Sequence, residues 1–155
     1  MPDPPLEHFE DDESLDGDEG LFRRLRPDWV VWDENDPSKI SRVSSVAFQL
    51  QSPEVAERLG YPGRCMSIAL ERTVMENPRG VDALVGGPLA NYGIARVTAG
   101  QMREQQFGLQ IVPEVDEPWH VVAFPLDSIS RAKTAQTPLA EKCKIVRVPQ
   151  RGAIL

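Results

Sequence analysis

Two side chains in this sequence could carry out acid–base chemistry. Glu71 ends the apolar segment CMSIALE, and His120 follows Pro118-Trp119 at the start of HVVAF. Histidine titrates near neutral pH, and a strand entrance can present one of its ring nitrogens to a cleft. The plainer interpretation is a structural His120 that is satisfied by hydrogen bonds to the acidic loop before it. Glu71 and His120 are the candidate catalytic residues.

Arginines and serines near the predicted strand ends could bind a phosphorylated ligand. Arginine suits bidentate binding of phosphate or carboxylate, and serine hydroxyls can shape a ribose pocket. The candidate ligand-binding residues are Arg24, Arg42, Ser44, Ser45 and Ser67. No glycine-rich phosphate loop accompanies them, because LVGGP lacks both the GxGxxG spacing and the Walker lysine. The alternative is that the arginines pair with acidic residues and the serines line a solvated sheet face.

Cysteine offers a third chemistry. Cys65 could act as a nucleophile with His120 as its base and Asp116, Glu117 or Asp127 as the orienting group. Cys65 also opens an apolar strand, and cysteine is among the most buried residue types, so a structural role is favoured. The two cysteines are far apart and form no CxxC motif. We therefore expect free thiols, no metal site and no bound cofactor.

These side chains need strands and helices to position them. Alternating apolar residues predict strands at 21–25, 29–32, 44–49, 64–72, 92–99, 109–112, 120–124 and 144–148. Capping residues predict helices at 52–60, 98–108 (ended by Gly108) and 128–142. Strands and helices mix without a sustained βαβ alternation. The expected fold is a single α+β domain with a mixed, mostly antiparallel sheet and two to three short helices.

Charge is distributed unevenly along the chain. The formal net charge is −7, yet residues 1–22 hold nine of the 24 acidic residues and none of the 17 basic ones. Such a segment cannot bury enough surface to offset its ordering entropy. We therefore expect a disordered acidic leader at 1–20 and the domain at 21–155. The alternative is an acidic arm that docks on a basic partner or on a basic patch of the protein itself. No concentrated cationic face is evident, so direct nucleic-acid binding is not expected.

Other features bear on location and partners. No apolar run reaches the roughly 20 residues that a membrane span needs, and the N-terminus does not resemble a secretory signal. The expected location is the cytoplasm, without membrane contact. Tryptophan and arginine often anchor protein interfaces. Trp29, Trp32 and Trp119 are the candidate contacts with a protein partner.

Five short elements carry a resemblance to a known group. They are Arg24, the segment SSVAF (44–48), the segment MSI (66–68), Gly108 and the segment PWH (118–120). In this order, over roughly residues 21–148, the chain resembles a group of small bacterial proteins of unknown function. That resemblance implies a bacterial source and a place in small operons, such as conflict or defence cassettes. It supplies no activity.

A more distant similarity is to NAD-consuming toxins of the Arg-Glu-Ser type, which have ADP-ribosyltransferase-like folds. That similarity implies NAD as substrate and roles for Arg24, Ser44, Ser45 and Glu71. The chain lacks a Gly-Gly-Arg-Phe-Asn-like segment and an obvious nicotinamide-stacking aromatic.

Three hypotheses follow for the function. The first is an accessory or binding protein that contacts another protein of its operon. The second is an enzyme that acts on NAD or a related nucleotide. The third is a Cys65–His120 thiol hydrolase. An interaction protein should tolerate Glu71→Gln and His120→Ala, a NAD enzyme should lose turnover with either change, and a thiol enzyme should be blocked by alkylation of Cys65.

Overall fold

A six-stranded antiparallel sheet forms the centre of the molecule. The computed structural model describes residues 8–150. The strand order is β6-β7-β4-β1-β5-β8, and every neighbouring pair is antiparallel. The strands are β1 (Gly20–Leu25), β4 (Met66–Leu70), β5 (Gly93–Thr98), β6 (Phe107–Ile111), β7 (His120–Pro125) and β8 (Lys144–Arg147). A separate two-stranded ribbon pairs β2 (Val30–Trp32) with β3 (Ile40–Val43).

Short helices connect these strands. The α-helices are α1 (Pro53–Arg58), α2 (Glu71–Met75), α3 (Ala99–Glu104) and α4 (Ile129–Lys142). The 3-10 helices are η1 (Pro27–Trp29), η2 (Ser45–Phe48), η3 (Gly80–Leu84) and η4 (Gly87–Leu89). The chain is therefore an α+β domain with a mostly antiparallel sheet, as predicted, and its described part has four α-helices rather than two to three. None of the helices between residues 8 and 150 is long and apolar enough to span a membrane.

The predicted helix starts at 52, 98 and 128 are confirmed. The Ser52 and Ser128 hydroxyls each accept a hydrogen bond from a backbone N–H of the helix they precede. Thr98 and Gln101 form a reciprocal capping box at the start of α3. These side chains satisfy amide groups that have no partner within the helix, which is why the local pattern predicts them well.

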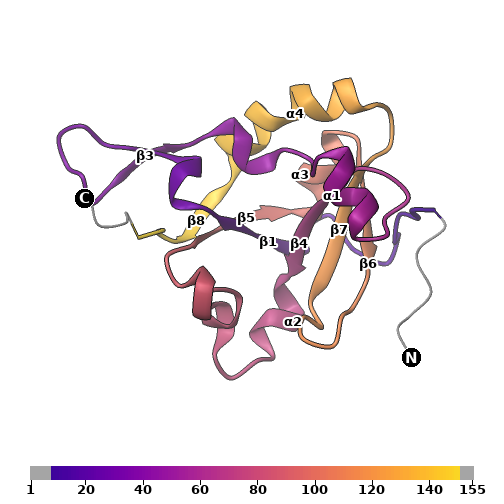
Figure 1. Ribbon diagram of the computed structural model, residues 1–155, viewed down its shortest axis with the longest axis horizontal. Helices are drawn as coiled ribbons and strands as arrows, with labels where there is room; N and C mark the ends of the chain where they lie inside the picture. The colour runs from indigo at the N-terminus through magenta and orange to yellow at the C-terminus, as the bar shows by residue number, and fades with distance from the viewer. Residues whose placement is uncertain (1–7, 151–155) are drawn as a thin grey trace.

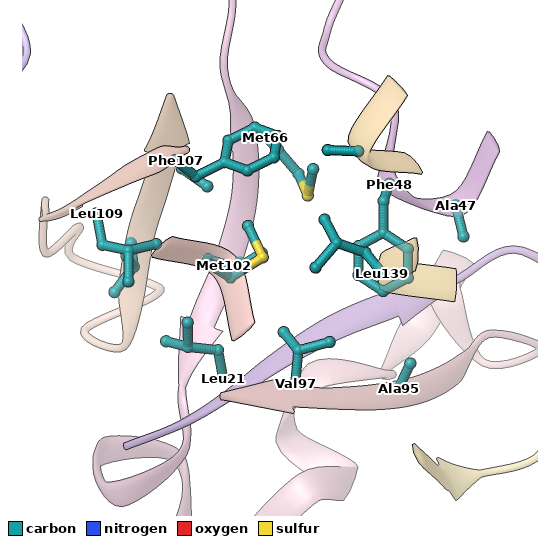
Figure 2. Close-up of a cluster of buried hydrophobic side chains, with 14 of the residues drawn as sticks. Leu21, Ala47, Phe48, Met66, Ala95, Val97, Met102, Phe107, Leu109 and Leu139 are labelled. Carbon is teal, nitrogen blue, oxygen red and sulfur yellow. The ribbon is translucent and has the colours of Figure 1, made fainter. Parts of the chain in front are cut away.

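The two faces of the sheet carry different clusters. In Figure 1, α3 and α4 lie above the sheet, and α2 lies below it with the segment that follows. Figure 2 shows the larger cluster, where Phe48, Met66, Met102 and Leu139 converge with side chains of the strands. Each such buried apolar side chain stabilises the fold by about 1.5–3 kcal/mol.

The smaller cluster lies on the opposite face of the sheet. It contains Phe22, Ala69, Val74, Leu84, Val85, Ile94 and Trp119. Strand β1 serves both faces, because Leu21 joins the larger cluster and Phe22 the smaller one. The candidate site lies on the face of the sheet that carries the smaller cluster.

The predicted strand at 44–49 is wrong. This segment is η2, and the Ser44 hydroxyl caps it by accepting from the backbone N–H of Val46 at 3.4 Å. Ala47 and Phe48 are both fully buried. Consecutive residues of a strand face opposite sides of a sheet, whereas this turn directs both into the larger cluster.

The disordered leader at 1–20 is also corrected for its described part. Leu15 is buried in the larger cluster, and the Phe9 ring stacks on Phe124 with centroids 4.8 Å apart. The backbone N–H of Asp12 donates to the carbonyl of Leu109 in β6 at 2.7 Å. Two apolar anchors thus hold an acidic segment against the sheet edge. Residues 1–7 lie outside the described residues.

The acidic segment is also bound by a basic side chain. The Arg103 guanidinium in α3 donates to the carbonyls of Leu15 and Asp12 and forms an ion pair with Asp11 at 3.4 Å. The expected solvation was based on the few apolar residues of the segment, and no local pattern connects that segment with a cation on a distant helix.

The predicted cap of α3 by Gly108 is wrong as well. The helix ends at Glu104, and Gln106 takes the left-handed conformation with φ 64°. Gly108 lies in β6, where an added Cβ would come within 2.3 Å of the Phe124 ring. Close packing against Phe124, rather than a helix end, requires a glycine at position 108.

Candidate functional site

A pocket opens where β1 and β4 separate. The two strands pair at only two positions, Leu21 with Leu70 and Phe22 with Ala69, whereas β1 continues to pair with β5 as far as Leu25. Beyond Phe22, β1 and β4 no longer pair, and the sheet has a gap between these two strands. A cavity of about 300 Å³ lies beside it on the face of the smaller cluster.

The Arg23 guanidinium bridges the gap between the strands. Its Nε donates to the carbonyl of Ala47 at 2.8 Å, and its Nη1 donates to the carbonyl of Ser67 in β4 at 2.8 Å. Strand β1 does not pair with β4 at this point, so the side chain replaces a missing ladder bond. The sequence therefore needs a long, multiply donating residue at position 23.

Aromatic and charged side chains line the pocket. The aromatic ones are Phe22, Trp29, Tyr92 and Trp119. The charged ones are Arg23, Arg24, Arg26 and Glu117. Three cations thus face one anion in a partly apolar recess, which favours a ligand that is both anionic and flat.

The cations differ in how fully they are neutralised. Arg24 donates to the carbonyl of Leu84 at 2.6 Å and to Glu117 at 2.7 Å, and Arg26 pairs with Asp28 at 3.0 Å. Among residues 8–150, no carboxylate lies within ion-pair distance of Arg23.

Burial and the neighbouring Arg24 lower the pKa of the Arg23 guanidinium to about 10. It still carries its proton near neutral pH. Arg23 therefore brings an uncompensated positive charge to the pocket wall.

Trp29 fixes the position of two of these cations. The guanidinium carbon of Arg23 lies 5.1 Å from the centroid of the Trp29 ring, and that of Arg26 lies 5.6 Å away. Both distances are within the range of cation–π attraction. The indole holds the guanidiniums without neutralising them, because it carries no net charge.

Ser67 and His120 are linked inside the pocket. His120 is 4% exposed, with Nδ1 3.0 Å from the carbonyl of Val112 and Nε2 3.2 Å from the Ser67 hydroxyl. A carbonyl can only accept, so Nδ1 carries a proton, and in the tautomer with its single proton there Nε2 accepts from Ser67. A Glu114 carboxylate oxygen lies 3.6 Å from Nδ1. The Gln51 amide donates to the Ser67 oxygen at 3.4 Å.

The structure brings together three of the predicted catalytic and ligand-binding residues. Arg24, Ser67 and His120 all line the pocket. Glu71 does not, because its carboxylate is bound by Arg96 in a two-bond pair of 2.5 and 3.2 Å. The predicted catalytic carboxylate of Glu71 is therefore occupied elsewhere on the same face of the sheet.

The remaining predicted ligand-binding residues lie apart from this pocket. Arg42 and Ser45 line a different groove, of about 450 Å³, between β3 and α4. Ser44 caps η2. They were grouped with Arg24 on the assumption that 44–49 was a strand of the same sheet.

The Cys65–His120 pairing is not supported by the register of β4 and β7. Ala69 lies opposite His120 and Met66 opposite Ala123. Cys65 is therefore four residues from His120 along the strand direction, about 13 Å. Its thiol is fully buried, lies 3.4 Å from the Gln51 side-chain oxygen, and has a pKa raised by burial to about 12. A thiolate nucleophile is not favoured there.

The tryptophans are less exposed than the partner hypothesis required. Trp119 is 7% exposed and belongs to the smaller cluster. Trp29 and Trp32 are partly buried against the larger cluster. Trp119 is therefore corrected from an interface residue to a pocket wall.

Sequence reasoning missed the roles of Arg23 and Glu117 in the site. Alternation along β1 places Arg23 and Arg24 on opposite faces, so their convergence on one pocket was not expected. The three nearby arginines were the available signal. Glu117 was considered only as an orienting group for a histidine.

The described residues contain no group of three or more His, Cys, Asp or Glu side chains that could hold a metal ion.

Comparison of the chain with protein-family models, with curated proteins and with solved structures finds no match.

Proposed function

We propose that this protein binds a small anionic molecule with one planar ring system in the pocket between β1 and β4. The observation that carries this proposal is Arg23, a partly buried cation on the pocket wall with no carboxylate partner among residues 8–150. A desolvated, unpaired charge is costly, and an incoming anion relieves that cost.

The shape of the pocket supports a flat ligand. Phe22, Tyr92 and Trp119 are among its lining residues, and its volume of about 300 Å³ is at the small end of ligand sites. A mononucleotide or an aromatic acid suits this space better than a dinucleotide. The ligand of the NAD hypothesis is thereby narrowed to a molecule with one ring system and one anionic group. Glu71 lies outside the site.

Calorimetric titration tests the proposal with three probes. AMP and indole-3-acetate carry a ring and an anion, and adenosine carries the same ring as AMP without the phosphate. We expect saturable binding of AMP or indole-3-acetate, and adenosine binding at least about tenfold weaker than AMP. The proposal fails if neither anion binds at millimolar concentration, or if adenosine binds as well as AMP.

Arg23→Met provides the matched variant. It keeps an unbranched apolar stem and removes the charge together with the hydrogen bonds to the Ala47 and Ser67 carbonyls, so we expect about a 10- to 100-fold loss of anion affinity from one lost charge-assisted contact. Arg42→Met removes a charge from the other groove and should leave the affinity unchanged. Thermal unfolding of both variants shows whether they remain folded.

A protein-partner role is a second proposal, supported by a different observation. Strand β8 is an edge of the main sheet, where Ile145 and Val146 are 36% and 43% exposed, and Val148, just after the strand, is 50% exposed. An exposed apolar edge strand is a surface to which another strand can add. Val146→Lys should abolish recovery of a partner in cross-linking of the full chain, and recovery that survives this change counts against the edge.

A further inference from the structure

We propose that Ser67 and His120 form a nucleophile–base pair that cleaves an ester of the ligand bound in the pocket. This inference rests on the proposed function, because the anionic part of the ligand would hold the ester beside Ser67. Ser67 and His120 are 53 residues apart in the sequence, and the sequence alone did not suggest that they contact each other.

The hydrogen bonds around the pair give each atom a direction. His120 Nδ1 donates to the carbonyl of Val112 at 3.0 Å, which leaves Nε2 as an acceptor that faces the Ser67 hydroxyl at 3.2 Å. The Gln51 amide donates to the same hydroxyl oxygen at 3.4 Å. With Nε2 as the acceptor and the Gln51 amide as a donor to its oxygen, the Ser67 hydroxyl can direct its proton at the ring. This is the arrangement that activates a serine with a neutral histidine.

The base also has an acidic neighbour. A Glu114 carboxylate oxygen lies 3.6 Å from His120 Nδ1, on the side away from Ser67. When the ring takes up the serine proton it becomes a cation, and a carboxylate at this distance stabilises it. Glu114 is half-exposed and lies beyond hydrogen-bond distance, so it acts as a nearby negative charge, while the Val112 carbonyl holds the Nδ1 proton.

The surroundings supply stabilisation for a developing anion. Arg23 Nη1 donates to the Ser67 carbonyl at 2.8 Å, so a positive charge lies close to the nucleophile. Ser67, His120 and Arg23 all line the same pocket. Negative charge that forms on an attacked ester oxygen would be stabilised by this cation in a partly water-excluded recess.

The chemistry balances with water as the second reactant. The Ser67 oxygen bonds to the acyl carbon, its proton passes to Nε2, the ester C–O bond breaks, and the leaving alcohol takes the proton from His120. Water then attacks the acyl-serine and gives a proton to Nε2, and the Ser67 oxygen leaves and recovers that proton. The products are a carboxylic acid and an alcohol.

A fluorophosphonate probe tests the pair without knowledge of the natural ester. The serine oxygen displaces fluoride from phosphorus, and intact-mass and peptide mass spectrometry locate the adduct. We expect one adduct on Ser67, none in Ser67→Ala, and labelling at least about 100-fold slower in His120→Gln. Ser45→Ala, in the other groove, should label as the native chain does. No adduct on Ser67, or equal labelling of His120→Gln, overturns the inference.

Calorimetry separates this inference from the proposed function. The native protein is titrated with AMP and with indole-3-acetate, and Ser45→Ala, in the other groove, serves as the variant whose binding should stay unchanged. Binding of either probe without an adduct leaves the ligand site standing and removes the catalytic role. An adduct without binding of either probe supports the nucleophile and removes the proposed ligand class. Thermal unfolding of Ser67→Ala and His120→Gln confirms that an absent adduct does not reflect a lost fold.

Discussion

Glu117→Gln should tighten anion binding. Glu117 is the one carboxylate among the residues that line the pocket, and it pairs with Arg24 at 2.7 Å. The amide keeps the shape and a hydrogen-bond acceptor for Arg24 while it removes the negative charge. An anion on the free side of the Arg24 guanidinium would lie roughly 6 Å from the carboxylate, where like charges repel by about 2–3 kcal/mol at an effective dielectric constant near 20.

Solvent reduces this repulsion, because the Glu117 side chain is 29% exposed. We therefore expect a gain of about 1–2 kcal/mol, or roughly 5- to 30-fold in affinity for AMP or indole-3-acetate. The ion pair itself is partly exposed and contributes only about 0–1 kcal/mol, so the variant should stay folded.

Calorimetric titration measures the change, with Glu104→Gln as the matched control. Glu104 pairs with the exposed Lys142 and does not line the pocket. The Glu104→Gln substitution makes the same change in net charge as Glu117→Gln, but away from the pocket. Affinity that falls in Glu117→Gln, or that rises equally in both variants, would refute a pocket that selects anions through its local charge.

Three further predictions concern the core, the charge of the pocket and the buried thiol. Phe48→Ala should lower the free energy of unfolding by about 3–5 kcal/mol in chemical denaturation, because Phe48 is fully buried, whereas Leu59→Ala, at a half-exposed site, should change it by at most about 0.5 kcal/mol. Affinity for AMP should fall as the pH is raised through about 10, where Arg23 loses its proton, and a flat pH profile there would exclude Arg23 as the anion contact. Cys65, with its pKa near 12, should resist iodoacetamide at neutral pH in the native protein and react in denaturant, and rapid native alkylation would show that the thiol is accessible.

Local signals in the sequence predicted most of the strands and helix starts. The caps at Ser52, Thr98 and Ser128 and the strands of the main sheet depend on neighbours in the chain, so the pattern contains the information. The segment 44–49 misled the same reasoning. Its alternating letters are compatible with a strand, and only the packing of Ala47 and Phe48 into one cluster selects the turn.

The candidate site was predictable in part for a different reason. His120 and Ser67 were identified by residue type, but their contact follows from the register of β7 against β4, which no local pattern specifies. Arg23 depends on the point where two strands cease to pair. Glu71 was drawn to the wrong role because its partner, Arg96, comes from β5, a strand that is distant in sequence.

Nuclear magnetic resonance of the arginine side chains tests the central claim most directly. Titration of the native protein with AMP, and separately with indole-3-acetate, should shift the Arg23 Nε–H and the Trp29 indole N–H together, with one dissociation constant. The Arg42 signal, from the other groove, should stay in place. Saturable shifts at Arg42 alone, or no shift at Arg23 with either probe, would contradict an anion site between β1 and β4.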